Sequence, residues 1–371
     1  MRFLDLKQPL IDNIDAGIAS HLQSPPGTGK SDFVEDLVQH LSKRDGEEWG
    51  FTTCFLATYQ PTDLLGYMVP TKVTNPDQTT SLASVFTTPN WMMTKPTEQY
   101  PHGRHINTFK RGIVFLDEWS QADGDTKKAA AQLKLKGEVG PHRLHKGIAV
   151  ISAGNRKEDR SGVTKEFDFV INRENQFNID PDFPSWEAWA IDHGIMPTTL
   201  TFAKANPQVV FDGKVPDNQG PWTTPRSLCM VDRLLQVKMK RNGGVLPDDQ
   251  TTAEQISGIM GAGAAQYMAF IKLEREMPKY EDIVKDPKGV KVPSKPDACM
   301  LVCYQLAHMI KEKDATAVVE YMERLPTEFS VTFATTACKR QPMLVANNAF
   351  DKWARKNSSL MAAIALVSKG Q

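Results

Sequence analysis

One stretch near the N-terminus constrains this chain more than any other: residues 20–31 read SHLQSPPGTGKS. The stretch contains a glycine-rich turn, and a helical pattern begins directly after Lys30 and Ser31. Such a loop between a strand and a helix directs several backbone N–H groups at one point, where the helix dipole also favours an anion. Lys30 adds a positive charge for the β- and γ-phosphates of a nucleotide, and Ser31 adds a hydroxyl for Mg²⁺. The stretch therefore predicts a nucleoside triphosphate site.

The loop departs from the usual pattern at one position. The first glycine of G-x-x-x-x-G-K-[ST] would fall at Ser24. That position only starts the turn, so we expect serine to be tolerated and phosphate binding to remain intact. The alternative is a turn that merely caps a helix, but Pro25-Pro26 before the glycines and Lys30-Ser31 after them argue against it. The residues expected to contact the nucleotide are Pro26, Gly27, Thr28, Gly29, Lys30, Ser31 and Asp32.

A second stretch supplies carboxylates. Residues 113–116 are four consecutive large apolar residues, which is typical of a strand buried on both faces of a parallel sheet. Asp117 and Glu118 follow at its carboxyl end, where open α/β sheets bind ligands. We expect Asp117 to hold Mg²⁺ together with Ser31, and Glu118 to orient or deprotonate the attacking water. A solvated strand end is the other reading of such a pair.

Asn155 follows the next apolar strand, at 149–153. A neutral amide at that edge can hydrogen-bond both a γ-phosphate and the attacking water. An asparagine after a strand is often only a turn residue, and its position downstream of Asp117 is what makes it a candidate.

Composition limits the remaining possibilities. The chain has 371 residues, of which 40% are hydrophobic and 24% charged, as expected of an ordinary globular protein with two or more domains. Forty-four basic residues balance forty-four acidic ones, so net charge favours neither nucleic acid nor a membrane surface as a partner. The five cysteines are scattered, which favours reduced thiols over disulfides. We predict a cytoplasmic protein, without a signal peptide or a membrane span.

The order of patterns predicts three regions: an α/β core at 1–182, an α-helical lid at 183–245 and a helical C-terminal extension at 246–371. Within the core, the proline-containing insert at 68–110 lacks periodicity, and 136–146 is a polar excursion with a basic tip. Residues 164–179 predict a short helix and an edge strand near 177–179, with Arg173 between them. Beyond the core, helices are predicted at 186–193, 198–205, from 224 through 235, 252–275, 298–312, 315–324 and 346–367.

These residues together resemble the AAA+ ATPases, and within them the MoxR-type, dynein-related branch. Residues 25–31 look like the Walker A motif, Leu116-Asp117-Glu118 like Walker B, and Ala153-Gly154-Asn155 like sensor 1. Thr224-Pro225-Arg226 is similar to the start of a lid helix that carries the sensor 2 arginine. The piece 63–66 matches the segment before the helix-2 insert of the branch, and 136–147 falls where its presensor hairpin would be.

The resemblance implies a P-loop AAA+ parallel sheet, ATP and Mg²⁺ as ligands, and a site that a neighbouring subunit completes. Arg173 stands where the family places the arginine finger, and Arg156 and Arg160 are rivals. A finger supplied in trans implies a homo-oligomeric ring, most often a hexamer. The resemblance also implies that Glu118, Asn155, Arg173 and Arg226 are the catalytic set. It further implies chaperone-like remodelling of a protein client, with a von Willebrand A-domain protein as a partner class.

Two other functions fit the same residues. One is an AAA+ motor or loader acting on nucleic acid, for which Lys136, Arg143 and Lys146 would form the basic contact. The other is a nucleotide-regulated scaffold that scarcely hydrolyses ATP, which the presence of Glu118 and Asn155 disfavours. Two His-x-x-His pairs, at 102–105 and 142–145, have the spacing of metal ligands but no third ligand near them in the sequence.

Overall fold

The computed structural model describes residues 1–156, 159, 167–356, 360, 362, 364 and 365. The chain forms two compact units, Met1–Pro181 with Gly213–Val215, and Asp182–Asp212 with Pro216–Gln371. The finer division of the second unit into a lid and an extension stays a prediction.

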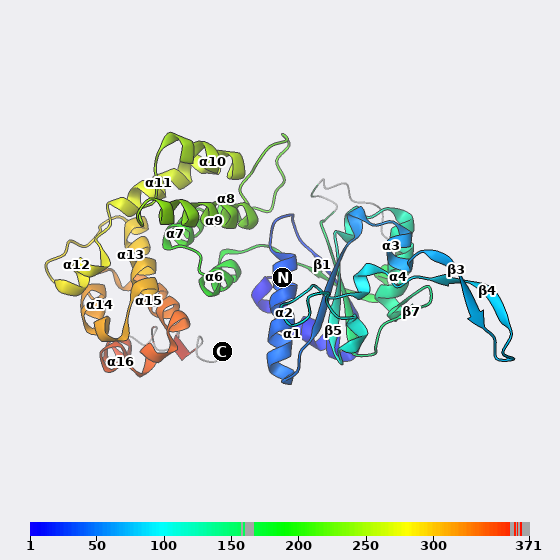
Figure 1. Ribbon diagram of the computed structural model, residues 1–371. Coiled ribbons are helices and arrows are strands. Elements are labelled where there is room, and N and C mark those ends of the chain that lie inside the picture. The colour runs from blue at the N-terminus through cyan, green and yellow to red at the C-terminus, as the bar shows by residue number, and fades with distance from the viewer. Residues whose placement is uncertain (157–158, 160–166, 357–359, 361, 363, 366–371) are drawn as a thin grey trace. The chain divides into compact units, whose positions relative to one another are not determined.

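The first unit is built on a parallel sheet (Figure 1). Its five strands are ordered β2-β5-β8-β1-β9, and each neighbouring pair runs parallel. The predicted P-loop type of α/β sheet is thereby confirmed, including the edge strand β9. The strand bounds are β1 Ala19–Gln23, β2 Gly50–Phe55, β5 Gly112–Asp117, β8 Ile148–Gly154 and β9 Glu174–Asn178.

Helices cover both faces of this sheet. Ile113 and Phe115 of β5 pack with apolar residues of α1 and α2, whereas Val114 and Leu116 pack on the other face with residues of α3, α4 and α5. Burial on both faces explains why β5 is a continuous apolar run. The helices of this unit are α1 Phe3–Ala16, α2 Lys30–Asp45, α3 Pro61–Leu65, α4 Gly124–Lys136 and α5 Asp168–Ile171.

Two hairpins leave the sheet. The insert that we expected to be irregular contains an antiparallel pair, β3 Met68–Thr74 and β4 Thr80–Phe86, which projects from the first unit (Figure 1). Nearly all of its side chains are exposed or half-buried, so the strands bury no apolar face and give no alternating signal in the sequence. The predicted excursion at 136–146 is a short hairpin of β6 Glu138–Val139 and β7 His142–Arg143.

The described part of the second unit is helical. The prediction of one helix over 252–275 is wrong, because the chain turns at Gly261, where φ is +61° and a Cβ atom would lie 2.1 Å from the carbonyl oxygen of Pro221. Helices α8, α12 and α15 are not among the predicted ones. The bounds are α6 Phe183–Asp192, α7 Pro197–Ala205, α8 Pro207–Val210, α9 Pro225–Arg241, α10 Gln250–Met260, α11 Gly263–Arg275, α12 Tyr280–Lys285, α13 Pro296–Met309, α14 Ala315–Met322, α15 Thr327–Arg340 and α16 Asn348–Arg355.

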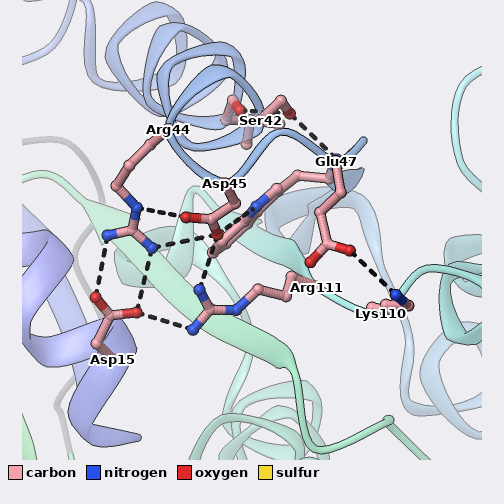
Figure 2. Close-up of polar contacts among 9 residues, drawn as sticks. Asp15, Ser42, Arg44, Asp45, Glu47, Lys110 and Arg111 are labelled. Atoms are coloured by element: carbon pink, nitrogen blue, oxygen red, sulfur yellow. Dashed lines mark hydrogen bonds and ion pairs between the residues drawn. The ribbon is translucent and has the colours of Figure 1, made fainter.

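Four charged side chains meet at the amino edge of the sheet, and we call them the lower-edge network: Asp15, Arg44, Asp45 and Arg111 (Figure 2). Arg44 donates to Asp45 at 2.6 Å and to Asp15 at 3.0 Å. Arg111 donates to the same two carboxylates, at 2.8 and 2.9 Å. The network therefore joins the ends of α1 and α2 to the start of β5.

Candidate active site

The phosphate loop lies between β1 and α2, as predicted. Gly27 and Gly29 have φ of +74° and +96°, a backbone conformation that glycine adopts without strain. The left-handed Gly29 is the N-cap of α2, and Lys30 is the first residue of the helix. The first N–H groups of a helix have no partner within it, so the start of α2 presents donors that suit a phosphate. Asp32 is exposed in the first turn.

Lys30 and Asn155 meet at the end of the sheet. The Lys30 ammonium donates to the carbonyl oxygens of Ser24 and Pro25 at 3.0 and 3.2 Å, and to the Oδ1 of Asn155 at 3.2 Å. Both side chains are largely buried, since Lys30 is 9% and Asn155 5% exposed. Two residues 125 positions apart are thus brought into direct contact at the expected phosphate site.

Ser31 and Asp117 form the second contact. The Ser31 hydroxyl donates to Oδ2 of Asp117 at 2.7 Å, and the other carboxylate oxygen accepts the backbone N–H of Glu118 at 2.9 Å. A hydroxyl and a carboxylate are oxygen ligands of the kind that Mg²⁺ takes from proteins, alongside water and substrate phosphates. These two side chains therefore fit the ion that the sequence predicted.

A metal site formed by protein side chains alone is not found among the described residues. Within the described ranges, no group of three or more His, Cys, Asp or Glu residues is placed to hold a metal ion. The pairs at 102–105 and 142–145 accordingly have no third ligand among those residues. His142 instead contacts the carbonyl oxygen of Leu65 at 2.9 Å.

Glu118 has an unusual backbone. Its φ of 53° and ψ of 34° place it in the left-handed region. Among the described non-glycine residues, the only other one with a positive φ is Gln78. That conformation costs a residue with a Cβ roughly 1–2 kcal/mol, and strain of this kind gathers at functional sites. The turn allows the chain to leave β5 directly after Asp117 and places Glu118, half-buried, at the carboxyl edge. The sequence contains no signal for this strain.

The residue two positions later supports the site. Ser120 accepts the backbone N–H of Asn155 through its hydroxyl at 2.8 Å. A Cβ atom on Gly154 would lie 3.0 Å from Ser120, so glycine lets the two segments approach closely. Ser120 thus ties the turn after β5 to Asn155. Sequence reasoning missed it, because a serine in a turn has no distinctive pattern.

Buried charges lie beneath the same turn. Lys134 of α4 and Glu174 of β9 form an ion pair with both side chains almost wholly buried, and the Lys134 ammonium lies 4.2 Å from the ring centroid of Trp119. Burial, reinforced by the positive charges of Lys134 and Lys127, holds the pKa of His21 well below its usual value. His21 is therefore neutral, with Nδ1 at 2.7 Å from the Ser152 hydroxyl.

The candidate arginines differ in their surroundings. Arg173 is exposed and comes directly before β9, whose first residue, Glu174, pairs with Ala19, at the opposite end of β1 from the phosphate loop. Its rival Arg156 donates to the carbonyl oxygen of Ile179 and to Asp180, both at 2.8 Å. Arg160 lies outside the described residues. Arg226 is exposed in the first turn of α9, in the second unit, so its role stays a prediction.

No helix among the described residues combines the length and the apolar character needed to cross a membrane.

Comparisons with known proteins find similarity in structure alone. No protein-family model matches the sequence, and no curated protein matches it either. The chain is similar to a variant of RuvB from Thermotoga maritima, at 10% identity and a TM-score of 0.39, over 76% of each chain. It is also similar to NtrX from Brucella abortus in complex with ADP, at 13% identity and a TM-score of 0.36, over 97% of this chain and 68% of that one.

Similarity at this level carries no argument about function. What the structure shows directly is a five-stranded parallel sheet flanked by helices and followed by a helical region.

Proposed function

We propose that this chain hydrolyses ATP in a Mg²⁺-dependent reaction. The proposal rests on one observation: two contacts, Lys30 to Asn155 at 3.2 Å and Ser31 to Asp117 at 2.7 Å, join the phosphate loop and its helix to the carboxyl ends of two other strands. A loop that only capped a helix would have no need of a carboxylate and an amide from separate strands. The convergence is what an ATPase site requires.

Each side chain has a separate task. Lys30 and the N–H groups at the start of α2 bind the phosphates of ATP. Ser31 and Asp117 would hold Mg²⁺, which neutralises charge on the phosphates when bound. Glu118 orients the attacking water and accepts its proton, and Asn155 holds the water or the γ-phosphate by a neutral hydrogen bond. Ser120 keeps Asn155 in position through its backbone N–H.

The direct test is Glu118→Gln. Loss of the general base should lower turnover by roughly 10²–10⁴-fold, while ATP affinity stays near that of the wild type. Phosphate release measures the first quantity and a fluorescent-nucleotide titration the second. Glu98→Gln, in an exposed loop, is the matched control and should leave both unchanged. Wild-type turnover in the Glu118 variant would refute the proposal.

The site is completed, on this proposal, by Arg173 of a neighbouring subunit in a ring. Arg173→Ala should lower turnover by roughly 10³–10⁵-fold and spare nucleotide affinity. Mixing that chain with the Glu118→Gln chain creates some sites that have both a normal Glu118 and a normal neighbouring Arg173. Turnover should therefore return in the mixture. A mixture with no activity at any ratio would exclude Arg173 as a finger supplied in trans.

By the resemblance to the MoxR-type branch, the ring remodels a protein client. A von Willebrand A-domain protein encoded beside this chain should bind it in a nucleotide-dependent manner, which a pull-down with the Glu118→Gln chain would detect. The competing function predicts instead a salt-dependent affinity for DNA that is lost when Lys136, Arg143 and Lys146 become alanine. That result, without client binding, would replace the proposed function.

A further inference from the structure

The serine that departs from the phosphate-loop pattern has a defined place in the structure. Ser24 is fully buried, at 0% exposure. Among the described residues other than glycine, only Gln78 and Glu118 have a positive φ, so the backbone at Ser24 does not require glycine. This explains why serine is tolerated. It leaves open why a buried hydroxyl should lie inside the loop.

The hydroxyl lies in a chain of hydrogen bonds that crosses the base of the loop. The Lys30 ammonium lies 3.2 Å from Oγ of Ser24, that oxygen lies 2.6 Å from Oγ1 of Thr28, and Oγ1 lies 3.1 Å from the carbonyl oxygen of Pro25. An ammonium can only donate and a carbonyl can only accept. Each hydroxyl then accepts from the group before it and donates to the next, so the chain runs from Lys30 through Ser24 and Thr28 to Pro25.

One other arrangement is available, in which Ser24 donates to the carbonyl oxygen of Pro25 at 3.3 Å. Thr28 would then donate to Ser24, and the loop would still be closed between positions 24 and 28. In both arrangements the first residue of the loop is joined to Thr28, which lies two positions before Lys30. A glycine at position 24 could make neither contact.

We propose that Ser24 is a positioning residue of the nucleotide site. Its hydroxyl joins Thr28 to Lys30 and holds the loop in its phosphate-binding shape before the nucleotide arrives. Groups fixed in the bound geometry lose less freedom on binding, so affinity rises. The inference rests on the proposed function only in so far as the loop binds a nucleotide, and hydrolysis is not required for it.

The test is a double-mutant cycle on nucleotide affinity, using the full chain and fluorescent ADP. Ser24→Ala should weaken binding about three- to tenfold, equivalent to one net hydrogen bond, and Ser24→Gly should weaken it at least as much. Thr28→Val keeps the shape of the side chain without its hydroxyl and should give a similar loss. Because the two hydroxyls act as one unit, the double variant Ser24→Ala/Thr28→Val should bind no more weakly than the worse single variant.

A structural hydroxyl on α2, outside the loop, provides the control. Ser42 donates to the carbonyl oxygen of Val38 at 2.9 Å and accepts the backbone N–H of Trp49 at 3.1 Å, near the far end of the helix (Figure 2). Ser42→Ala should lower the melting temperature without changing nucleotide affinity. The loop variants should weaken nucleotide binding, and this readout separates them from the Ser42 control.

The outcomes separate the two proposals. If the wild type binds nucleotide and both Ser24→Ala and Thr28→Val bind it equally well or more tightly, the proposed role of Ser24 is rejected. The ATPase proposal would remain. Additive losses in the double variant would overturn the role of Ser24 as well, because the hydroxyls would then act independently. A wild-type chain that binds no nucleotide would overturn both. Should Ser24→Ala fail to fold, unchanged binding in Thr28→Val alone is sufficient to reject the inference.

Discussion

Helix α2 begins at one charged cluster and ends at another, and the two clusters are built differently. At its start, Lys30 donates to neutral oxygens of Ser24, Pro25 and Asn155, and nearby Asp117 accepts from a hydroxyl and an amide. At its end, in the lower-edge network, two arginines are paired with two carboxylates in a closed square (Figure 2).

The difference separates a binding site from a structural one. Contacts of an ammonium with neutral oxygens are weaker than its contacts with phosphate, so a ligand can replace them at low cost. A guanidinium that is already paired with a carboxylate gains much less from binding a new anion. The contacts of Lys30 with neutral oxygens are therefore those that a ligand site would use, whereas the paired charges of the lower-edge network are those of a structural contact. Substitutions at the two ends of α2 should accordingly affect different measurements.

Lys30→Ala should give the largest effect. It removes the ammonium that the phosphates would contact, and charge-assisted hydrogen bonds of about 1.5–3 kcal/mol each imply a loss of nucleotide affinity on the order of 10²-fold or more. The melting temperature without nucleotide should change little. Lys43→Ala, on the exposed side of the same helix, is the control and should bind nucleotide normally. Unchanged affinity in the Lys30 variant would remove the distinction between the two clusters.

Asp117→Asn should give the next largest effect. The amide keeps the size of the side chain but loses the charge, so the gain in ATP affinity that Mg²⁺ provides should fall roughly 10-fold or more, while binding in EDTA should hardly change. Titrations of ATP with Mg²⁺ and with EDTA measure both. Asp125→Asn, whose carboxylate pairs with Lys128 on the exposed start of α4, should keep the full response to Mg²⁺. Equal losses under both conditions would argue against a metal role for Asp117.

How far the sequence predicts this molecule depends on what each segment packs against. Strand β5 is recognisable because residues 113–116 face helices on both sides, and burial forces an unbroken apolar run. Strands β3 and β4 escape prediction because their side chains face solvent, so Lys72 lies opposite Leu82 without any periodic pattern. The break in the helix at Gly261 depends on the nearby carbonyl of Pro221, and no local pattern shows that distant contact.

The site divides in the same way. That Lys30 meets Asn155 and Ser31 meets Asp117 could be predicted, because the expected chemistry demands particular residue types next to glycines or strand ends. The left-handed backbone of Glu118 and the support from Ser120 could not, since both arise from how β5 and β8 lie side by side. Ser24 was expected only to be tolerated, and the structure places its hydroxyl within hydrogen-bonding distance of Lys30 and Thr28.

Asp45→Asn tests the opposite end of α2. The carboxylate accepts from Arg44, Arg111 and the indole of Trp49, and its side chain is 16% exposed. Partly exposed ion pairs contribute little each, so we expect a loss of about 1 kcal/mol in the free energy of unfolding, which lowers the melting temperature by about 2–4 °C. Nucleotide affinity should not change. A Glu35→Gln control, which breaks a more exposed pair with Lys95, should have a smaller effect. Weaker nucleotide binding in the Asp45 variant would contradict the comparison.

The loss of stability that Asp45→Asn causes should become smaller in acid. Hydrogen bonds from Arg44, and then from Arg111, hold the pKa values of both Asp15 and Asp45 below the usual value of 3.8. A carboxylate with a lower pKa in the folded than in the unfolded state stabilises the protein above the unfolded value, and the contribution is lost as the pH falls through the folded value.

The difference in melting temperature between the wild type and Asp45→Asn should therefore be constant from neutral pH to about pH 5 and shrink below about pH 4. Melting curves of both chains across this range measure it. A difference that widened in acid would mean that protonation of Asp45 stabilises the fold, which is incompatible with a carboxylate held ionised by two arginines. The contrast between the two ends of α2 would then fail at the structural end.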